Sequence, residues 1–262
     1  MDERAVLGEG PRWDSARGCL LWVDIDRGLV HHGNITSAYD EPVGAAAPTE
    51  GGGVLVATAS ALVLDGTVVA RFPHGADVRS NDGACDPAGR FWIGTTARDH
   101  RDGAGALYRY DGELVRVLDG VTISNGLGWS PDTSLMYYVD TPTRRIDVFD
   151  YDGEISGRRP FAEVDGLPDG LCVDDEGGVW VALWGGGRVE RYDAGGALVD
   201  VLRVPAENPT ACCFGGADGR SLFVTTAAPD GRVYVTRAGV GGPPAQPFRR
   251  TAPSDAEPTS AR

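Results

Sequence analysis

The chain has 262 residues, of which 42% are hydrophobic, and its formal net charge is −14 at pH 7. This length allows one large domain with a sizeable core, and an acidic chain is a poor partner for nucleic acid or anionic membranes. The 38 glycines and 17 prolines are typical of many short strands joined by tight turns. The five cysteines have no CxxC spacing, which argues against a zinc cluster or a disulfide framework.

The N-terminal sequence M-D-E-R-A-V-L has neither the basic segment nor the apolar segment of a signal peptide. No apolar run approaches the roughly 20 residues that a membrane span needs. We therefore expect a soluble, cytoplasmic protein without a membrane partner. The sequence does not decide the oligomeric state, for which we expect a monomer or a weak homodimer.

Strand-like apolar cores recur along the chain at intervals of about 40 residues, a period typical of β-propellers. Between them lie second alternating stretches, such as A-L-Y-R-Y-D-G at 106–112, with Gly and Asp at the expected hairpin turns. No long window has helical periodicity. In chain order the six cores are L-L-W-V-D (20–24), V-L-V-A-T (54–58), F-W-I-G-T (91–95), M-Y-Y-V-D (136–140), V-W-V-A-L (179–183) and L-F-V-T-T (222–226).

Six repeats predict an all-β fold, a six-bladed β-propeller whose closed ring removes most free strand edges. Only eight residues precede Glu9, so the N-terminal strand available for closing the ring is short. We expect one domain over residues 1–248. Residues 249–262 are polar and proline-rich and are predicted to form a disordered C-terminal tail.

Four acid or amide side chains occupy the same place in four versions of the repeat. Equivalent positions of a closed ring surround a common axis, so four oxygen donors there should converge on one point. Oxygen ligands of which two are charged suit a hard cation such as Ca²⁺, Mg²⁺ or Mn²⁺, and Zn²⁺ is also compatible. The residues are Glu9, Asn81, Asn125 and Asp169, each five positions before Asp14, Asp86, Ser130 and Asp174 respectively.

Each of these residues also has a purely structural interpretation. Asn-Asp-Gly, Asn-Gly and Asp-Gly are turn sequences, in which the side chain often caps only its own backbone. Four residues at one repeat offset, with Glu9 in a sequence that does not favour turns, support the metal-site interpretation. By contrast, Asp86, Asp132, Asp174 and Asp175 are expected to be structural turn residues, and His31 and His32 to be exposed at a strand end.

The chain resembles the regucalcin (senescence marker protein)/gluconolactonase family. The resemblance extends over roughly residues 7–240 and is specific in its combination of motifs, in order and spacing. The matching stretches are L-G-E-G-P-R-W (7–13), R-S-N-D-G-A-C-D-P-A-G-R-F-W-I-G-T (79–95), I-S-N-G-L-G-W-S (123–130), L-P-D-G-L-C-V-D-D-E-G (167–177), L-W-G-G-G-R-V (183–189) and C-C-F-G-G (212–216).

The resemblance implies a six-bladed propeller with one divalent metal in its central channel, held by Glu9, Asn125 and Asp169. It also implies that Arg79 and Asn81 contact the substrate or metal-bound water. Family members often have a substrate-binding Glu just before the G-A-L-Y strand. Here Arg101 or Asp102 lies near that slot, so the identity of the substrate does not carry over.

The function that we expect is a divalent-metal-dependent lactonase that hydrolyses a small sugar (aldono) lactone, with Asp169 as both metal ligand and general base. Trp184 is a candidate for an apolar wall of the pocket. The alternative is a non-catalytic calcium- or metal-binding propeller. Three other interpretations are disfavoured: a WD-repeat scaffold because regular W-D endings are absent, a paraoxonase-type hydrolase because no histidine is well placed, and a serine hydrolase because there is no G-x-S-x-G.

Overall fold

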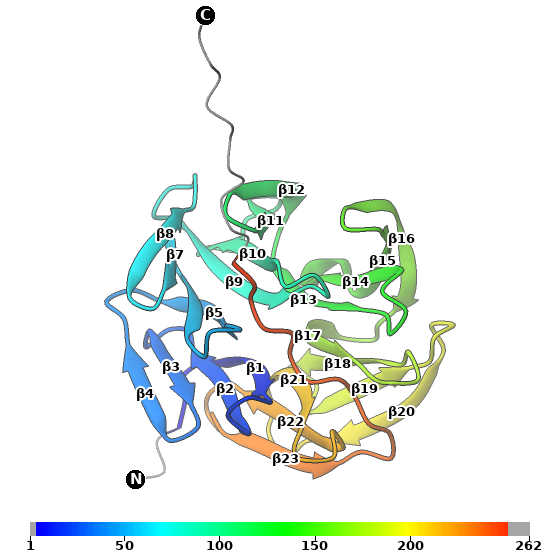
Figure 1. Cartoon of the computed structure of the whole chain (residues 1–262). Coiled ribbons are helices and arrows are strands. Elements are labelled where there is room, and N and C mark those ends of the chain that lie inside the picture. The colour runs from blue at the N-terminus through cyan, green and yellow to red at the C-terminus, as the bar shows by residue number, and fades with distance from the viewer. Residues whose placement is uncertain (1–3, 251–262) are drawn as a thin grey trace, which may run out of the picture.

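The structure is a computed structural model and describes residues 4–250. Six small antiparallel sheets surround a central axis as the blades of a propeller (Figure 1). The predicted all-β, six-bladed fold is therefore confirmed, and each predicted apolar core forms the second strand of one blade. One short 3₁₀ helix, η1 (Thr141–Thr143), follows β14.

Each of the first three blades is a four-stranded meander whose first strand is the innermost. The alternation of apolar and polar residues places one face of each sheet against the next blade. The strands are β1 (Gly8–Asp14), β2 (Cys19–Asp24), β3 (Leu29–His32) and β4 (Ile35–Ala38); β5 (Val43–Pro48), β6 (Val54–Thr58), β7 (Ala61–Leu64) and β8 (Thr67–Arg71); β9 (Val78–Cys85), β10 (Phe91–Ala97), β11 (Gly105–Tyr110) and β12 (Leu114–Val121).

The last three blades repeat this pattern, except that the sixth has three strands. Their strands are β13 (Ser124–Trp129), β14 (Leu135–Asp140), β15 (Arg145–Tyr151) and β16 (Ile155–Glu163); β17 (Leu167–Val173), β18 (Val179–Trp184), β19 (Arg188–Tyr192) and β20 (Leu198–Arg203); β21 (Pro209–Gly215), β22 (Ser221–Thr226) and β23 (Val233–Arg237).

The ring closes between the first and sixth blades through a few residues before β1. The amide of Ala5 donates to the carbonyl of Gly231 at 2.8 Å, and the amide of Ala228 donates to that of Val6 at 2.9 Å. Trp13 of β1 stacks on Phe223 of β22, with 5.4 Å between the ring centroids. A short N-terminal segment thus closes the ring through backbone hydrogen bonds and one aromatic contact.

The hydrophobic core is divided among the interfaces between neighbouring blades. One cluster joins the third and fourth blades around Trp92, which is fully buried, and another joins the fourth and fifth around Tyr137 and Val181. Because every blade presents an apolar face to the next, the stability of the ring depends on all of its interfaces.

Residues 241–249, which we call the strap, run from the sixth blade across one mouth of the ring to the third (Figure 1). At one end the amide of Asp175 donates to the carbonyl of Gly241 at 2.9 Å. At the other, the amide of Phe248 donates to that of Pro48 at 2.7 Å. Phe248 is buried and stacks on Tyr110 at 5.7 Å, so the strap closes with an apolar anchor. Most of the predicted tail, residues 251–262, lies outside the described residues.

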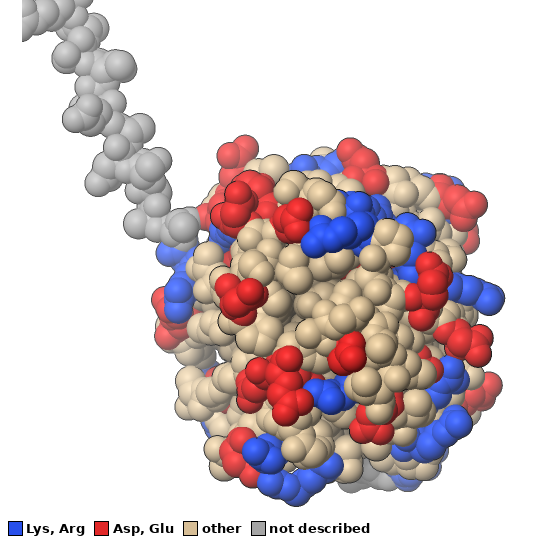
Figure 2. All heavy atoms as spheres, turned by 90° about the vertical axis from the view of Figure 1, so that its right-hand side faces the viewer, with Lys and Arg blue, Asp and Glu red and all other residues tan. Residues whose placement is uncertain are grey.

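Acidic and basic side chains are interspersed on the face shown in Figure 2, between areas of neutral residues. Many of the basic groups are paired with acids, as in the contacts of Arg101 with Asp99 and Arg237 with Asp218. In residues 4–250 there is no helix long and apolar enough to span a membrane.

Candidate metal and substrate site in the central channel

Each of the six inner strands has a register shift of the β-bulge type at the same place in the repeat. In β17 the shift lies between Pro168 and Leu171, and in β13 it lies between Ser124 and Leu127. A bulge bends the strand and re-aims a side chain that regular pairing would direct elsewhere. The shifts of β1, β5, β9 and β21 fall at the corresponding positions.

The bulges place the four predicted oxygen donors in equivalent buried positions. Glu9, Asn81, Asn125 and Asp169 are each 5% exposed, so none of them lies in an exposed surface turn. Asn81 and Asn125 are in direct contact, since Nδ2 of Asn81 donates to Oδ1 of Asn125 at 2.7 Å. The structure therefore buries all four residues at the same position of the repeat, in the inner strands β1, β9, β13 and β17.

Thr141 fixes the orientation of the Asn125 amide. Its hydroxyl donates to the carbonyl of Pro168 at 2.7 Å and therefore accepts from Nδ2 of Asn125, also at 2.7 Å. The amide oxygen of Asn125 is thereby directed toward Asn81. The oxygen of Asn81 in turn accepts a hydrogen bond from Nη1 of Arg79 at 2.6 Å. Each of the two amide oxygens thus accepts one hydrogen bond from a neighbouring side chain and keeps a second lone pair for another partner.

The remaining two inner strands contribute no donor of this kind. A side chain at Gly44 of β5 would begin only 2.5 Å from the backbone of Ser80 and Asn81, so no residue larger than glycine fits there. In β21 the position is Thr210, whose hydroxyl is engaged by the carbonyl of Gly8 and by Thr225. The donor set is thus limited to four of the six blades.

The two carboxylates of this set are buried without full hydrogen bonding. Oδ1 of Asp169 has no hydrogen-bond partner among the described residues, and Glu9 has only the amide of Gly10, at 3.0 Å. Burial raises the pKa of Glu9 to about 8, with a further contribution from Asp82. Burial and the charge of Glu9 raise the pKa of Asp169 well above its usual range. Two unsatisfied buried carboxylates are costly unless a cation or a proton accompanies them.

A buried ion pair lies next along the channel. Nη2 of Arg12 donates to Oδ1 of Asp82 at 3.1 Å and to the carbonyl of Gly83 at 2.9 Å. Oδ2 of Asp82 has no partner in the described part of the chain. The sequence predicts no role for Arg12 or Asp82. The only signals are that Arg12 lies three positions after Glu9 and that Asp82 is an acid next to Asn81.

The other predicted site residues lie at different depths. Arg79 is half-buried beside Asn81, and burial lowers the pKa of its guanidinium. Trp184, whose Cα pairs with that of Leu167, is 38% exposed at the end of β18 nearest Asp169. Arg101 and Asp102 are exposed, and Arg101 is bound by Asp77 and Asp99, so neither reproduces a buried substrate-binding carboxylate.

Comparison with known proteins shows which family the chain belongs to. Residues 7–228 match the model of the family described as SMP-30/Gluconolactonase/LRE-like region. The chain belongs to this family. All five predicted site residues, Glu9, Arg79, Asn81, Asn125 and Asp169, fall within the matched region, whereas the strap lies beyond it.

Similar proteins within the family carry different names. A protein of Bacillus subtilis, "Putative sugar lactone lactonase YvrE", is 38% identical over 248 residues, which are 86% of this chain and 85% of that one. Regucalcin of Danio rerio is 37% identical over 248 residues, 86% of this chain and 84% of its own. The crystal structure of a calcium-binding protein, regucalcin from Agrobacterium tumefaciens, superimposes with a TM-score of 0.89 at 29% identity. It covers 95% of this chain and 96% of the other.

The channel residues fit a divalent cation of the kind that the regucalcin comparison suggests. No three His, Cys, Asp or Glu side chains within residues 4–250 form a metal-binding group by themselves. The candidate set instead combines the carboxylates of Glu9 and Asp169 with the amide oxygen of Asn125. Oxygen donors of this type suit hard cations, and the unpartnered Oδ1 of Asp169 is the atom that a cation would satisfy.

Two expectations about surrounding residues have clear outcomes. Asp86, Asp132 and Asp174 are structural, as predicted, because each accepts hydrogen bonds from the turn that follows it. The expectation for His32 was wrong: this residue is 6% exposed, and its Nε2 lies 2.8 Å from Oδ2 of Asp14. His32 is thus a buried hydrogen-bond partner of Asp14, the turn aspartate of the first blade.

Proposed function

We propose that the protein is a divalent-metal-dependent lactonase that opens a small sugar (aldono) lactone to the aldonic acid. The observation that carries this proposal is the pair of buried, incompletely hydrogen-bonded carboxylates Glu9 and Asp169 beside an amide oxygen of fixed orientation. Together the two carboxylates balance the charge of one divalent cation. Membership of a family with lactonase and gluconolactonase names supports the choice of reaction.

In this proposal Glu9, Asn125 and Asp169 hold the ion, which is Ca²⁺, Mg²⁺, Mn²⁺ or Zn²⁺. Three protein ligands leave room for water and for a substrate oxygen. When bound, such an ion polarises the lactone carbonyl and stabilises the negative charge that develops on its oxygen. The hydrogen bond that Nδ2 of Asn125 donates to Thr141 fixes the orientation of the amide and so of its oxygen.

Asp169 acts as the general base. A water oxygen forms a bond with the lactone carbonyl carbon while one of its protons passes to the Asp169 carboxylate. The ring C–O bond then breaks, and the ring oxygen takes up a proton to become a hydroxyl group of the open-chain acid. One carboxylate oxygen of Asp169 would hold the ion, and the other would accept the proton.

Arg79 and Asn81 orient the substrate. Nη1 of Arg79 donates both to Oδ1 of Asn81 and to the carbonyl of Ser80, which fixes the guanidinium at the side of the channel. Its remaining donors are available to hydroxyl or carbonyl oxygens of a sugar lactone. Trp184, exposed near the same end of the fifth blade, is proposed to form an apolar wall.

The test is proton release from a panel of aldonolactones by metal-stripped protein, with each of the four ions added back in turn. Hydrolysis that returns with one or two ions is the expected result. It would identify the ion and the substrate class together. The Asp169→Asn variant should lose this hydrolysis, whereas Asp200→Asn, which removes the same charge from an exposed residue of β20 in the same blade, should retain it.

A metal-binding propeller without catalysis is the second candidate. It is favoured by the regucalcin relatives and by the structural neighbour described as a calcium-binding protein. It predicts that a divalent ion raises the melting temperature while no lactone of the panel is hydrolysed above background. That combination would replace the lactonase proposal.

A further inference from the structure

Two cysteines of neighbouring inner strands meet at the interface between the fifth and sixth blades. The sulfur atoms of Cys172 in β17 and Cys212 in β21 lie 3.5 Å apart. All five cysteines of the chain are free thiols in the structure. A disulfide needs the two sulfur atoms to approach to about 2.05 Å, so a displacement of about 1.5 Å shared between two side chains would join them.

The two thiols are already oriented toward each other. The thiol of Cys212 donates to the carbonyl of Trp180 at 3.6 Å, so its sulfur accepts from the thiol of Cys172. Cys212 is fully buried in the apolar cluster that Trp180 and Val224 form between the fifth and sixth blades. Because packing and hydrogen bonds already restrict both side chains, little further conformational entropy is lost when the sulfur atoms bond.

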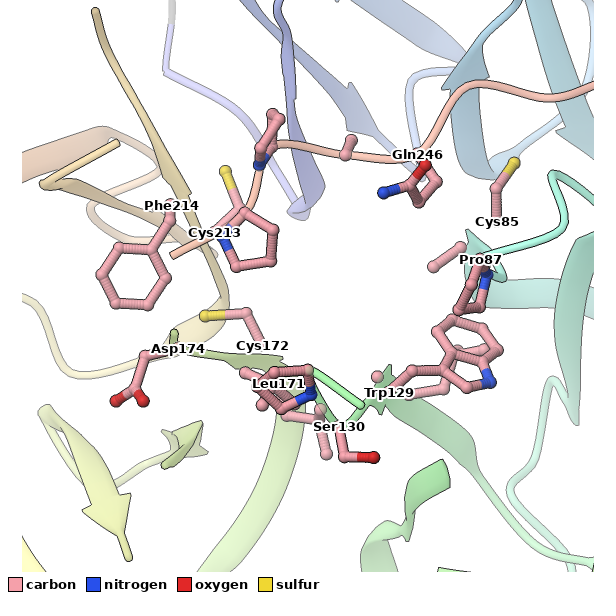
Figure 3. Close-up of a pocket in the computed structure, with 18 of the residues that line it drawn as sticks. Cys85, Pro87, Trp129, Ser130, Leu171, Cys172, Asp174, Cys213, Phe214 and Gln246 are labelled. Atoms are coloured by element: carbon pink, nitrogen blue, oxygen red, sulfur yellow. The ribbon is translucent and has the colours of Figure 1, made fainter. Parts of the chain in front are cut away.

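The adjacent thiol, Cys213, does not share this arrangement. Successive residues of a strand point to opposite faces of the sheet. Cys212 therefore faces the fifth blade, whereas Cys213 faces the first, where its cross-strand partner Phe223 stacks on Trp13. Figure 3 shows the sulfur atoms of Cys172 and Cys213 pointing in different directions. Of these two neighbouring thiols, only that of Cys212 is placed to bond with Cys172.

A small oxidant can reach Cys172 from solvent. This residue is half-buried and lines a cavity of about 320 Å³ under the strap (Figure 3). The residues around the cavity include Thr133 and Asp175, both of which are exposed, so the cavity opens to solvent. Its volume is enough for several molecules of the size of water, each of which takes about 30 Å³ in the liquid.

The other cavity thiols lack a partner of this kind. Cys85 and Cys213 also line the cavity, but neither is hydrogen-bonded to another thiol in the described chain. Burial raises the pKa of both. Burial, together with the hydrogen bond to Cys212, also raises the pKa of Cys172 well above its usual range. Because the thiolate is the reactive form, all of these thiols are expected to react slowly at pH 7.

We propose that Cys172 and Cys212 form a redox-sensitive disulfide between the inner strands of the fifth and sixth blades when the protein meets hydrogen peroxide. The sulfur of Cys172 attacks one peroxide oxygen, the O–O bond breaks, and water leaves with the thiol proton, so that Cys172 becomes a sulfenic acid. The sulfur of Cys212 then attacks that of Cys172, the S–O bond breaks, and a second water leaves with the proton of Cys212. The two thiols lose two electrons, and one peroxide is reduced to two waters.

The cross-link should stabilise the folded protein. It closes a covalent loop of about 40 residues across the interface between the two blades, which lowers the conformational entropy of the unfolded chain. Oxidation should therefore raise the melting temperature by roughly 5–10 °C. This inference does not depend on the proposed lactonase activity.

The test exposes the full-length protein to a slight excess of hydrogen peroxide for several hours and then counts the thiols after denaturation. The reduced protein should show its five thiols, and the oxidised protein should show three and be about 2 Da lighter. Dithiothreitol should restore the original count, mass and melting temperature. Peptide mapping without reduction should link the peptide that contains Cys172 to the one that contains Cys212.

Single substitutions identify the pair. In Cys172→Ala and in Cys212→Ala, peroxide should leave the count of remaining thiols and the melting temperature unchanged. Cys19→Ala, which removes a thiol of the first blade, should still lose two thiols and gain stability on oxidation. Wild-type protein that keeps all five thiols, or a link from Cys172 to Cys213 instead of Cys212, would overturn the proposal.

Discussion

Asp169 and Asp174 lie five residues apart at the two ends of the same inner segment and are both buried, yet their surroundings are opposite. Asp174 accepts hydrogen bonds from the amides of Glu176 and Gly178, from the indole of Trp180 and from Nε of Arg191. Asp169 has an oxygen with no donor at all in the described chain. Asp174 is thus fully engaged in the fold, whereas Asp169 keeps an oxygen for the proposed cation.

The same division runs through the repeats. Asp86 of the third blade binds the indole of Trp92, the hydroxyl of Tyr151 and the guanidinium of Arg90. The equivalent donor residues at the other end, Glu9 and Asn125, keep oxygens that protein groups do not fully use. A side-chain oxygen whose hydrogen bonds are all made by protein groups stabilises the fold. An oxygen that lacks some of its hydrogen bonds is available to a cation.

The largest effect is expected from Asp169→Asn. Lactone turnover should fall at least about 1000-fold, because the variant loses both a charged ligand and the proposed base. The metal-free protein should at the same time melt at a higher temperature, since the variant no longer buries a carboxyl group there beside Glu9. Proton release and thermal unfolding in chelator measure the two effects. Turnover retained near the wild-type rate would remove Asp169 from the mechanism.

Asp174→Ala should have the complementary effect on the fold. The change leaves the guanidinium of Arg191 and the indole of Trp180 without their buried acceptor and should cost about 3 kcal/mol of unfolding free energy. Urea denaturation measures the loss, and Asp175→Ala, at an exposed neighbour, should change it by less than about 0.5 kcal/mol. Turnover per folded molecule should stay within about twofold of wild type. A large loss of turnover at unchanged stability would break the division between the two aspartates.

The pH dependence of metal-free stability should distinguish the two ends of the channel. The pKa of Glu9 is raised in the folded state from 4.5 to about 8, so the folded protein holds a proton that the unfolded chain releases. This contribution to stability is fully present below pH 4.5 and is lost as the pH rises toward 8. Relative to Glu9→Gln, the wild-type melting temperature should fall by roughly 10 °C between pH 5 and pH 8 in chelator.

A bound divalent ion should reverse that trend. Metal binding requires the deprotonated carboxylates, so it should release protons and its affinity should increase with pH up to about 8. Calorimetric titrations in two buffers of different ionisation enthalpy measure the protons released. An affinity independent of pH over this interval would mean that Glu9 is not a ligand.

The repeat pattern in the sequence predicts the blades and the four donors because both follow from the same periodicity. Period-two alternation identifies the second strand of every blade, and a fixed offset from the following turn identifies Glu9, Asn81, Asn125 and Asp169. Both patterns can be found by comparing the repeats of this one chain with each other.

Features outside the repeat could not be predicted in this way. The bulge of β9 directs two consecutive residues, Asn81 and Asp82, into the buried channel, where a regular strand would alternate. Phe248 is a single aromatic residue in a proline-rich segment, and no periodicity predicts that it is buried against Tyr110. The far end of the strap is held by contacts with residues more than 100 positions away, such as the hydrogen bond from Phe248 to Pro48.

The smallest loss of stability is expected in the fourth blade. There Ser130 occupies the position of the turn aspartates Asp86 and Asp174 of the third and fifth blades. Its hydroxyl accepts from the amide of Leu135 at 3.0 Å and donates to Asp132 at 2.6 Å. It has neither an arginine nor an indole to satisfy. Ser130→Ala should therefore cost only about 1 kcal/mol in urea denaturation, a third of the expected cost at Asp174. A cost equal to that of Asp174→Ala would show that the backbone turn, and not the buried arginine and tryptophan, sets the structural value of this position.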